Sequence, residues 1–152
     1  MKQIRNWILG SCVLMLAGTA TATAQEKEAP APKTIREGEH KFSLQWIGWG
    51  DTFGKATIKK LTDSTYQIEG RHLSDTSDDY AYINGVLTMV TPRRLKFTGT
   101  IETYVKDHYE SQICRKEGNY TFHAKDQRKY WRLQEMENCQ GNNLVDYVDI
   151  YF

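Results

Sequence analysis

Aromatic side chains that could bind a ligand are frequent between residues 46 and 151. Tyr and Trp combine a flat apolar ring with a hydrogen-bonding tip, so a cavity or groove lined by them suits a small apolar molecule, a glycan or a protein partner. Cross-strand aromatic pairs also stabilise sheets, so packing is the favoured interpretation and binding the alternative. The residues concerned are Trp46, Trp49, Phe53, Tyr80, Tyr82, Tyr104, Tyr109, Tyr130, Trp131, Tyr147 and Tyr151.

Four residues near the end of the chain are the first binding candidates, namely Tyr130, Arg132, Tyr147 and Tyr151. Arg132 adds a fixed positive charge and several hydrogen-bond donors to the three phenol rings. A binding role gains support if one face of the fold gathers these four side chains beside a pocket.

Catalytic patterns are weak in this sequence. It contains no G-x-S-x-G elbow, no Ser-His-Asp spacing and no glycine-rich phosphate loop. Glu135, Asp146 and Asp149 could converge as a glycosidase pair, but their spacing does not require it. We therefore predict no catalytic residue and no enzyme, and keep a hydrolase as an alternative.

Metal and cofactor sites are not predicted either. The four histidines are scattered without H-x-H spacing, at positions 40, 72, 108 and 123, and no C-x-x-C occurs. The run "DTSDD" at 75–79 begins like a calcium loop. It then fails, because Tyr80 replaces the required Gly and Val86 stands where the bidentate Glu belongs. A polar turn is the better interpretation.

The N-terminus is typical of a secretory signal peptide. Lys2 and Arg5 precede an apolar stretch from Trp7 to about Gly18, and small residues with an A-x-A pattern lead to a predicted cleavage after Ala24. The apolar stretch is too short for a membrane span, which needs about 20 residues. We expect an exported protein, in the periplasm, outside the cell or on its surface, with no transmembrane helix after processing.

The cysteines support an oxidising compartment. Cys12 lies inside the predicted signal, where "LGSC" loosely resembles a lipoprotein cleavage box, although the apolar run continues past it. Cys114 and Cys139 survive processing, and two such thiols in a small exported domain most often form one disulfide. The 24 residues between them would give about 3 to 4 kcal/mol of stabilisation.

Charge gives no reason to expect nucleic acid as a partner. Removing residues 1–24 from the 152-residue chain leaves 128 residues, which fits one domain. Of the 20 basic residues 18 then face 19 acidic ones, a net charge near −1. We expect a monomer with an unknown small molecule, glycan or protein as its partner.

The mature chain reads as a flexible leader followed by one all-β domain. Residues 25–39 mix Pro, Ala and charge without periodicity, and from residue 40 short alternating segments are separated by turn residues. Antiparallel pairing is required by the short connections. We predict an up-and-down meander of 8–10 strands, as a closed barrel rather than a sandwich. The predicted strands are 41–49, 55–61, 65–73, 79–83, 86–90, 94–105, 108–114, 119–125, 129–136 and 144–152.

Turn residues and alternation give finer predictions. Asn84-Gly85 predicts a type I′ hairpin, and Gly118-Asn119 predicts another turn. In the segment 95–105, Leu95 and every second residue after it should point inward. In the last strand Asp146 shares a face with aliphatic residues. It must therefore find partners or lie at the mouth of the barrel.

The ending "DYVDIYF" leaves an outer-membrane barrel as an alternative, because such barrels commonly close on an aromatic residue. A membrane barrel needs strands of about 9 to 11 residues with a continuous apolar outer face. Several predicted strands are shorter, and Lys or Arg intrudes on many of them. A closing strand of a non-membrane barrel explains the ending better.

Several runs resemble a known family. "LKFTGTIET", a following Cys, "RKYWRLQEMEN", a second Cys and "DYVDIYF" resemble a family of small secreted bacterial proteins, over about residues 43–152. The resemblance implies no particular activity.

A looser resemblance concerns the architecture. A Trp in the first strand, a tight meander and a late strand bearing Arg are similar to the calycin architecture of lipocalins and avidins. In those families an Arg near the end of the barrel packs across the first-strand Trp, which implies that Trp46 or Trp49 stacks with Arg132 or Arg128. Trp46 and Trp49 therefore join the binding candidates. The run "QWIGWGD" departs from the G-x-W of those families, so the analogy is architectural.

The hypothesis from the sequence is an exported, non-catalytic β-barrel that binds a small apolar molecule or a glycan. The alternative is an interaction or inhibitor module, which predicts an exposed aromatic patch in place of an interior cavity.

Overall fold

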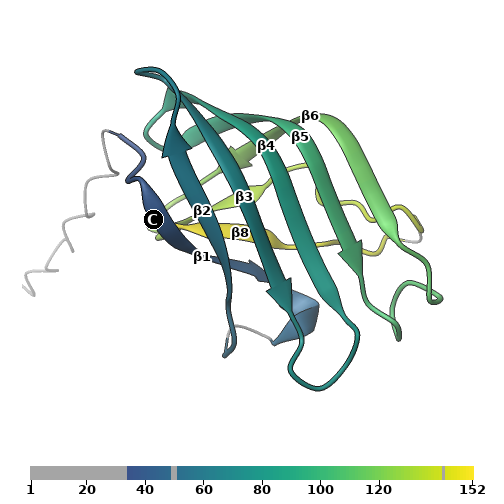
Figure 1. Cartoon of the computed structure of the whole chain (residues 1–152). Coiled ribbons are helices and arrows are strands. Elements are labelled where there is room, and N and C mark those ends of the chain that lie inside the picture. Colours follow the sequence, from purple (N-terminus) through teal and green to yellow (C-terminus); the bar gives the residue numbers. More distant parts are fainter. Residues whose placement is uncertain (1–33, 49–50, 142) are drawn as a thin grey trace, which may run out of the picture.

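The computed structural model describes residues 34–48, 51–141 and 143–152, and shows a closed antiparallel β-barrel (Figure 1). Each strand pairs with the next along the chain, and the last pairs with the first. This confirms the predicted all-β meander. The predicted signal peptide and most of the predicted leader lie outside the described residues. The elements are β1 (Gly38–Leu44), the 3₁₀ turn η1 (Gln45–Ile47), β2 (Gly54–Lys60), β3 (Thr65–Leu73), β4 (Tyr80–Thr91), β5 (Arg94–Tyr104), β6 (Cys114–His123), β7 (Tyr130–Leu133) and β8 (Val148–Tyr151).

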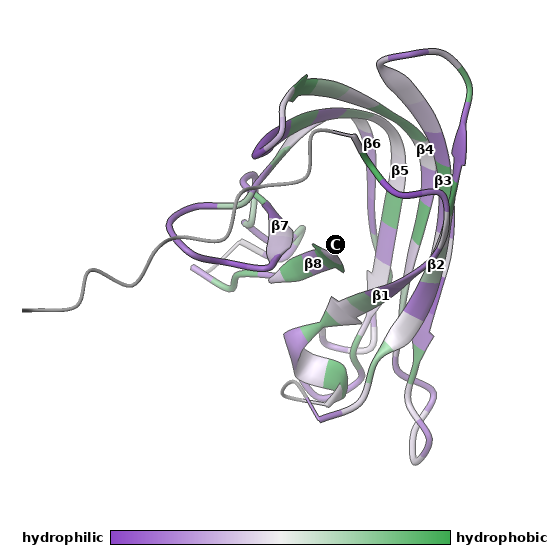
Figure 2. Ribbon diagram, turned by 90° about the vertical axis from the view of Figure 1, so that its left-hand side faces the viewer, coloured by the Kyte–Doolittle hydropathy of each residue, from purple (hydrophilic) through white to green (hydrophobic). Residues whose placement is uncertain are grey.

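The barrel has one long wall and one short wall. Strands β3 to β6 contain 9 to 12 residues each, whereas β7 and β8 contain four each. Figure 2 shows β7, β8 and β1 facing the long, curved strands across the barrel. β6 pairs with β7 at Phe122 and His123, near the end of β6. The short wall carries the candidate site described below.

Alternating apolar side chains fill the barrel interior. As predicted, Leu95, Phe97, Ile101, Thr103 and Val105 all point inward and are at most 2% exposed. The space between the ribbons in Figure 2 is occupied by these side chains and their partners from the other strands. Burying each Leu, Ile or Phe stabilises the fold by about 1.5 to 3 kcal/mol, so this core is the main source of stability. Its largest fully buried members are Trp131, Tyr66, Tyr109, Phe42, Phe97 and Phe122.

Two predicted turns are wrong, because both lie inside strands. Asn84-Gly85 lies inside β4, so the predicted strands 79–83 and 86–90 are one strand, and Gly118-Asn119 lies inside β6. Gly85 pairs with Gly99, which pairs in turn with Gly118. A Cβ added to Gly99 would lie 2.6 Å from the Cα of Gly85. Gly85 and Gly99 therefore permit a close approach of their strands, whereas a Cβ added to Gly118, which has a φ of 147°, would meet no atom closer than 3.7 Å. No chain reversal occurs at any of the three glycines.

The predicted strand 108–114 is also wrong. This segment forms turns in which Glu110 and Ser111 have positive φ angles of 50° and 59°, and β6 begins at Cys114. Tyr109 belongs to these turns but is fully buried, so its ring packs in the core as the side chain of a strand residue would.

The ends of several other predicted strands also move. The predicted strands 129–136 and 144–152 shorten to β7 and β8. β1 begins at Gly38, two residues before the predicted start of the barrel, and Ile35 before it is buried.

The predicted disulfide between Cys114 and Cys139 is confirmed, with an S–S distance of 2.04 Å. It ties the start of β6 to the loop between β7 and β8. Among the residues that the structure describes, no helix has the length and apolarity needed to cross a membrane.

Candidate functional site

Strand register places predicted binding residues on the outer face of the short wall. Tyr130 pairs with Tyr151 and Arg132 pairs with Asp149, while Trp131 and Ile150 between them point into the core. Because side chains alternate along a strand, the first four share the outer face. Tyr147 reaches the same place, since its ring centroid lies 4.1 Å from the Arg132 guanidinium carbon. The four predicted residues Tyr130, Arg132, Tyr147 and Tyr151 are thus brought together.

A bidentate ion pair fixes Arg132. Its Nε donates to Oδ1 of Asp149 and its Nη2 to Oδ2, both at 2.7 Å. Asp149 is 4% exposed although it points away from the core. The hydrogen bonds to Asp149 raise the pKa of Arg132, whereas burial raises the pKa of the Asp149 carboxyl. The guanidinium is therefore held in one plane beside Tyr147, and it also lies 5.2 Å from the ring centroid of Tyr130.

The aromatic contacts continue from this pair toward β1. The rings of Tyr130 and Tyr151 lie 5.1 Å apart, and that of Phe53, before β2, lies 5.2 Å from Tyr151. The Lys41 ammonium sits 4.6 Å from the Phe53 centroid. We call this continuous line of side chains the aromatic row: Tyr147, Arg132, Tyr130, Tyr151, Phe53 and Lys41. Sequence reasoning missed Lys41 and the role of Phe53, because both join the row through the closure of β8 on β1.

An open cleft of about 540 Å³ adjoins the row and shares Tyr151, Phe53 and Lys41 with it. Its other charged side chains are Arg36, Glu39, Lys55 and Lys129. His40 also borders the cleft, with its Nδ1 2.6 Å from the Tyr151 carbonyl oxygen and its Nε2 2.7 Å from that of Arg36. His40 therefore ties together the two backbone segments that form the cleft walls.

Trp46 lies apart from the row. Its Nε1 donates to Oδ1 of Asp146 at 3.2 Å, and its ring centroid is 4.3 Å from that of His108. The stacking of Arg128 or Arg132 on Trp46 that the calycin resemblance implied is wrong. Arg132 packs on the two tyrosines instead, and Arg128 lies 5.7 Å from the Tyr130 centroid. Trp49 lies outside the described residues.

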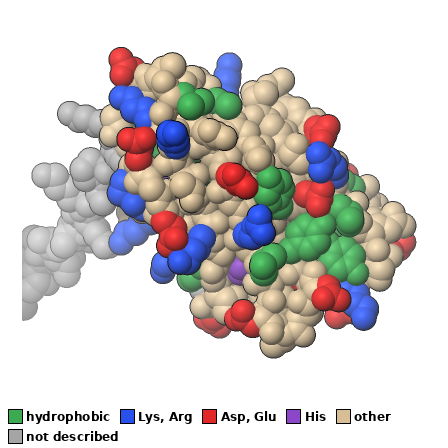
Figure 3. Space-filling model, in the orientation of Figure 1, with side chains coloured by type: hydrophobic (Ala, Val, Ile, Leu, Met, Phe, Trp, Pro, Cys, Tyr) green, Lys and Arg blue, Asp and Glu red, His purple; other side chains and the backbone are tan. Residues whose placement is uncertain are grey.

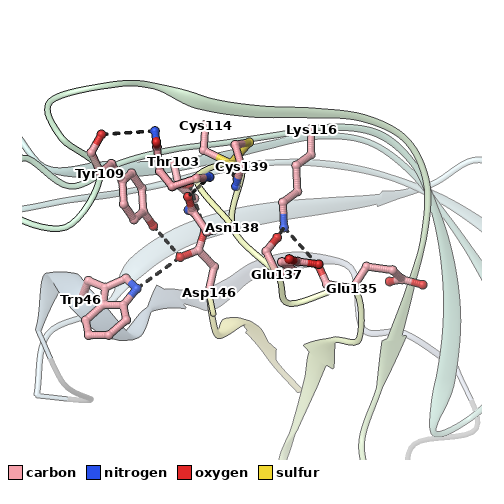
Figure 4. The surroundings of a disulfide bond; sticks show 11 residues. Trp46, Thr103, Tyr109, Cys114, Lys116, Glu135, Glu137, Asn138, Cys139 and Asp146 are labelled. Carbon is pink, nitrogen blue, oxygen red and sulfur yellow. Dashed lines mark hydrogen bonds between the residues drawn. A yellow bond between two sulfur atoms is a disulfide. The ribbon is translucent and has the colours of Figure 1, made fainter. Parts of the chain in front are cut away.

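Asp146 finds the partners that its sequence position requires (Figure 4). Besides Trp46, Oδ1 accepts a 2.6 Å hydrogen bond from the Tyr109 hydroxyl, and Oδ2 accepts from Thr103 at 3.2 Å and from Asn138 at 2.7 Å. Burial raises the pKa of Tyr109, with the Asp146 charge adding to it, so the phenol stays a donor at neutral pH. Four donors thus satisfy one carboxylate that is 1% exposed.

The three carboxylates considered for hydrolysis do not meet. Asp149 pairs with Arg132, Asp146 lies in the donor cluster, and the Glu135 carboxylate accepts from the backbone amide of Thr121 at 2.9 Å. Within the described residues, no group of three or more His, Cys, Asp or Glu side chains is placed to hold a metal ion.

Another open hollow, of about 560 Å³, lies between β6 and residues 134–137. Its cation, Lys116, donates to the backbone carbonyls of Glu135 and Glu137 (Figure 4). Burial lowers the pKa of the Lys116 amine, and its hydrogen bonds are already made to the two carbonyls. The hollow offers a ligand less free charge than the cleft beside the aromatic row.

A second aromatic surface lies on the long wall, where Figure 3 shows hydrophobic side chains gathered over the ends of β4 and β5. We define the tyrosine patch as Leu73, Tyr80, Tyr82 and Tyr104. Leu73 is 58% exposed, and the Tyr80 and Tyr104 rings stack at 5.9 Å. The Tyr80 hydroxyl donates to Glu102 at 2.7 Å, and burial together with that bond raises the pKa of Tyr80 to about 12.

Comparison with known proteins shows the family of this chain. The model of the PM1083 family matches residues 20–152. An uncharacterized protein, PM1083, from Pasteurella multocida (strain Pm70) is 41% identical over 117 residues, which cover 76% of this chain and 72% of that protein. No solved structure matches the chain. The eight-stranded barrel, its disulfide and its outer aromatic row are thus features of a chain that belongs to the PM1083 family.

Proposed function

We propose that the protein is an exported, non-catalytic binding module that holds a glycan on the aromatic row outside the barrel. The observation that carries the proposal is the continuity of the row with an open cleft. Successive ring and cation contacts of 4.1 to 5.2 Å run from Tyr147 to Lys41.

The interior of the barrel favours an outer site. Large side chains from every strand occupy it, and Phe42, Phe97, Phe122 and Trp131 are fully buried there. A small apolar ligand inside the barrel would have to displace this core, which is costly because protein interiors are close-packed. The filled interior therefore supports a proposed site on the outside of the barrel.

The chemistry of the row suits a sugar. Tyrosine rings present apolar surface next to hydroxyl groups, as sugar rings do. Among the described residues, Nη1 of Arg132 has no hydrogen-bond acceptor, whereas Nε and Nη2 are held by Asp149. The Nη1 group can donate to a ligand hydroxyl without the entropy cost of ordering the arginine, because the ion pair has already ordered the guanidinium.

The outer surface of the long wall argues for water over lipid as its surroundings. Glu69, Arg71 and Lys96 lie on this wall and are exposed, as is Lys59 on the neighbouring strand β2. On the lipid face of a membrane barrel each Arg or Lys near the midplane would cost about 2 to 4 kcal/mol. An outer-membrane barrel is therefore disfavoured on energetic grounds.

Glycan-array screening of the processed chain, followed by calorimetric titration of the best hits, tests the proposal. We expect Tyr130→Ala and Tyr151→Ala to weaken binding at least tenfold, which corresponds to about 1.4 kcal/mol. Tyr82→Ala on the opposite wall is the matched control and should leave the affinity unchanged. Absence of glycan binding by the unmodified chain, or equal affinities for all three variants, would contradict the proposal.

The tyrosine patch favours a protein partner as a second candidate function. Tyr and Arg are enriched at the centres of protein interfaces, and Arg71 and Tyr82 lie side by side across β3 and β4 next to the exposed Leu73. A photo-reactive residue at position 73 should cross-link one defined partner in cell-envelope extracts. The same residue at position 59 should not. Identical cross-links from both positions would count against this candidate.

A further inference from the structure

We infer that the ligand of the aromatic row is an acidic glycan, whose carboxylate, sulfate or phosphate groups are taken by the adjoining cleft. This inference rests on the proposed function and adds the chemical class of the ligand. It is independent of the tyrosine patch.

Positive side chains are concentrated in the cleft. Arg36, Lys41, Lys55 and Lys129 line it, whereas Glu39 supplies the one carboxylate side chain among the described residues that line the cleft. The processed chain as a whole is expected to carry a net charge near −1, so the excess of cations here is local. Clefts lined by one sign of charge attract ligands of the opposite sign.

The single acidic side chain does not neutralise the cleft. Glu39 pairs with Lys55 at 3.1 Å, and the two side chains are 60% and 72% exposed, so this surface ion pair is weak and easily rearranged. Lys41 and Lys129 have no carboxylate within salt-bridge distance among the described residues. At least two cations thus remain available to a ligand.

Arg36 is ordered at the edge of the cleft. Its Nη1 donates to the Glu37 carbonyl at 3.3 Å and its Nη2 to the Glu39 carbonyl at 2.5 Å. The His40 ring nitrogens lie 2.7 and 2.6 Å from the neighbouring carbonyl oxygens of Arg36 and Tyr151. The Arg36 guanidinium is thus held by the Glu37 and Glu39 carbonyls and keeps its positive charge at the edge of the cleft.

Ring and charge are close enough to act on one sugar unit. The Lys41 ammonium lies 4.6 Å from the Phe53 centroid, and the Phe53 and Tyr151 rings are themselves 5.2 Å apart. A sugar ring against Phe53 or Tyr151 would place its acid group beside Lys41. This coupling distinguishes an acidic glycan from a peptide of acidic residues alone, such as polyaspartate, which offers charge without a stacking ring.

Two matched ligands test the inference by calorimetry. Oligogalacturonate and its fully methyl-esterified form share the same rings and differ in charge, and a heparin-derived hexasaccharide separates sulfate from carboxylate recognition. We expect one of the two acidic glycans to bind at least tenfold tighter than the methyl ester, with an affinity that falls as salt is raised. Lys41→Gln combined with Lys129→Gln should remove that preference. Lys59→Gln on β2 combined with Lys96→Gln on β5, both outside the cleft, should retain it.

The outcomes separate this inference from the proposed function. If neutral glycans bind as tightly as acidic ones and still require Tyr151, the glycan site stands and its acidic specificity is refuted. If polyaspartate binds as tightly as the best acidic glycan, the cleft recognises charge alone and the inference is refuted. If single-stranded DNA does so, the site does not select sugar rings and the inference is likewise refuted. If no acidic or neutral glycan binds, the proposed function fails with it.

Discussion

Replacing Asp146 by Ala should destabilise the barrel by about 3 to 5 kcal/mol, the range typical of removing one partner from a buried charged contact. The carboxylate accepts hydrogen bonds from Trp46, Thr103, Tyr109 and Asn138. The last three donors belong to residues that are at most 4% exposed, so they cannot turn to water. Each buried donor left without an acceptor costs about 1 to 3 kcal/mol. The variant no longer has to bury a carboxylate, which offsets part of that sum.

Asp146→Asn separates shape from hydrogen bonding. Its amide can donate to the Thr103 hydroxyl, which also accepts. The Asn138 amide cannot reverse without loss, because its Oδ1 already accepts from the Gln140 backbone amide at 2.9 Å. One donor is therefore left without an acceptor, and we expect a loss of about 1 to 2 kcal/mol.

Urea unfolding with the disulfide intact, followed by far-ultraviolet circular dichroism, measures these differences. Asp107→Ala, at an exposed turn, is the control and should change the free energy of unfolding by less than about 0.5 kcal/mol. A loss below about 1 kcal/mol for Asp146→Ala, or a larger loss for Asn than for Ala, would refute the reasoning.

Three further stability predictions follow from the fold. Gly99→Ala should lower the free energy of unfolding in urea by about 3 kcal/mol, since its Cβ would meet backbone atoms at 2.2 to 2.6 Å. Gly141 has a positive φ but open space around it, so Gly141→Ala should cost about 1 to 2 kcal/mol. Burial lowers the pKa of His72 from 6.5, so folding favours its neutral form, and stability should fall as pH drops below 6.5. His72→Asn should flatten that part of the pH profile. Replacing Cys114 and Cys139 by Ala should lower the free energy of unfolding by about 3 to 4 kcal/mol, seen as a lower urea midpoint.

The correct predictions concern features that depend on the alternation of residues along a strand, on the length of the connections and on the number of cysteines. Alternation identified the inward face of residues 95–105, and the short connections required an antiparallel meander. Cys114 and Cys139 paired as expected. Asp146 was recognised as needing partners because a carboxylate among aliphatic residues cannot be buried alone.

The failed predictions concern features that local sequence does not encode. Asn84-Gly85 has the composition of a hairpin turn, but Gly85 is needed where β4 approaches Gly99 of the next strand. That requirement arises from strand register, which depends on the whole barrel. In the same way Lys41 and Phe53 join Tyr151 through the pairing of β1 with β8, which are about 100 residues apart along the chain.

The Arg132–Asp149 ion pair bears on why this surface exists. Asp149 and its cross-strand partner Ser43 point away from the core but are only 4% and 6% exposed. Burying a charge pair usually gains little stability over an apolar pair of the same volume. Stability alone therefore does not account for a guanidinium fixed between two tyrosine rings on the outside of a barrel whose interior is already filled. The binding role proposed above would account for it, because the cost of fixing the arginine would then be met during folding and not during binding.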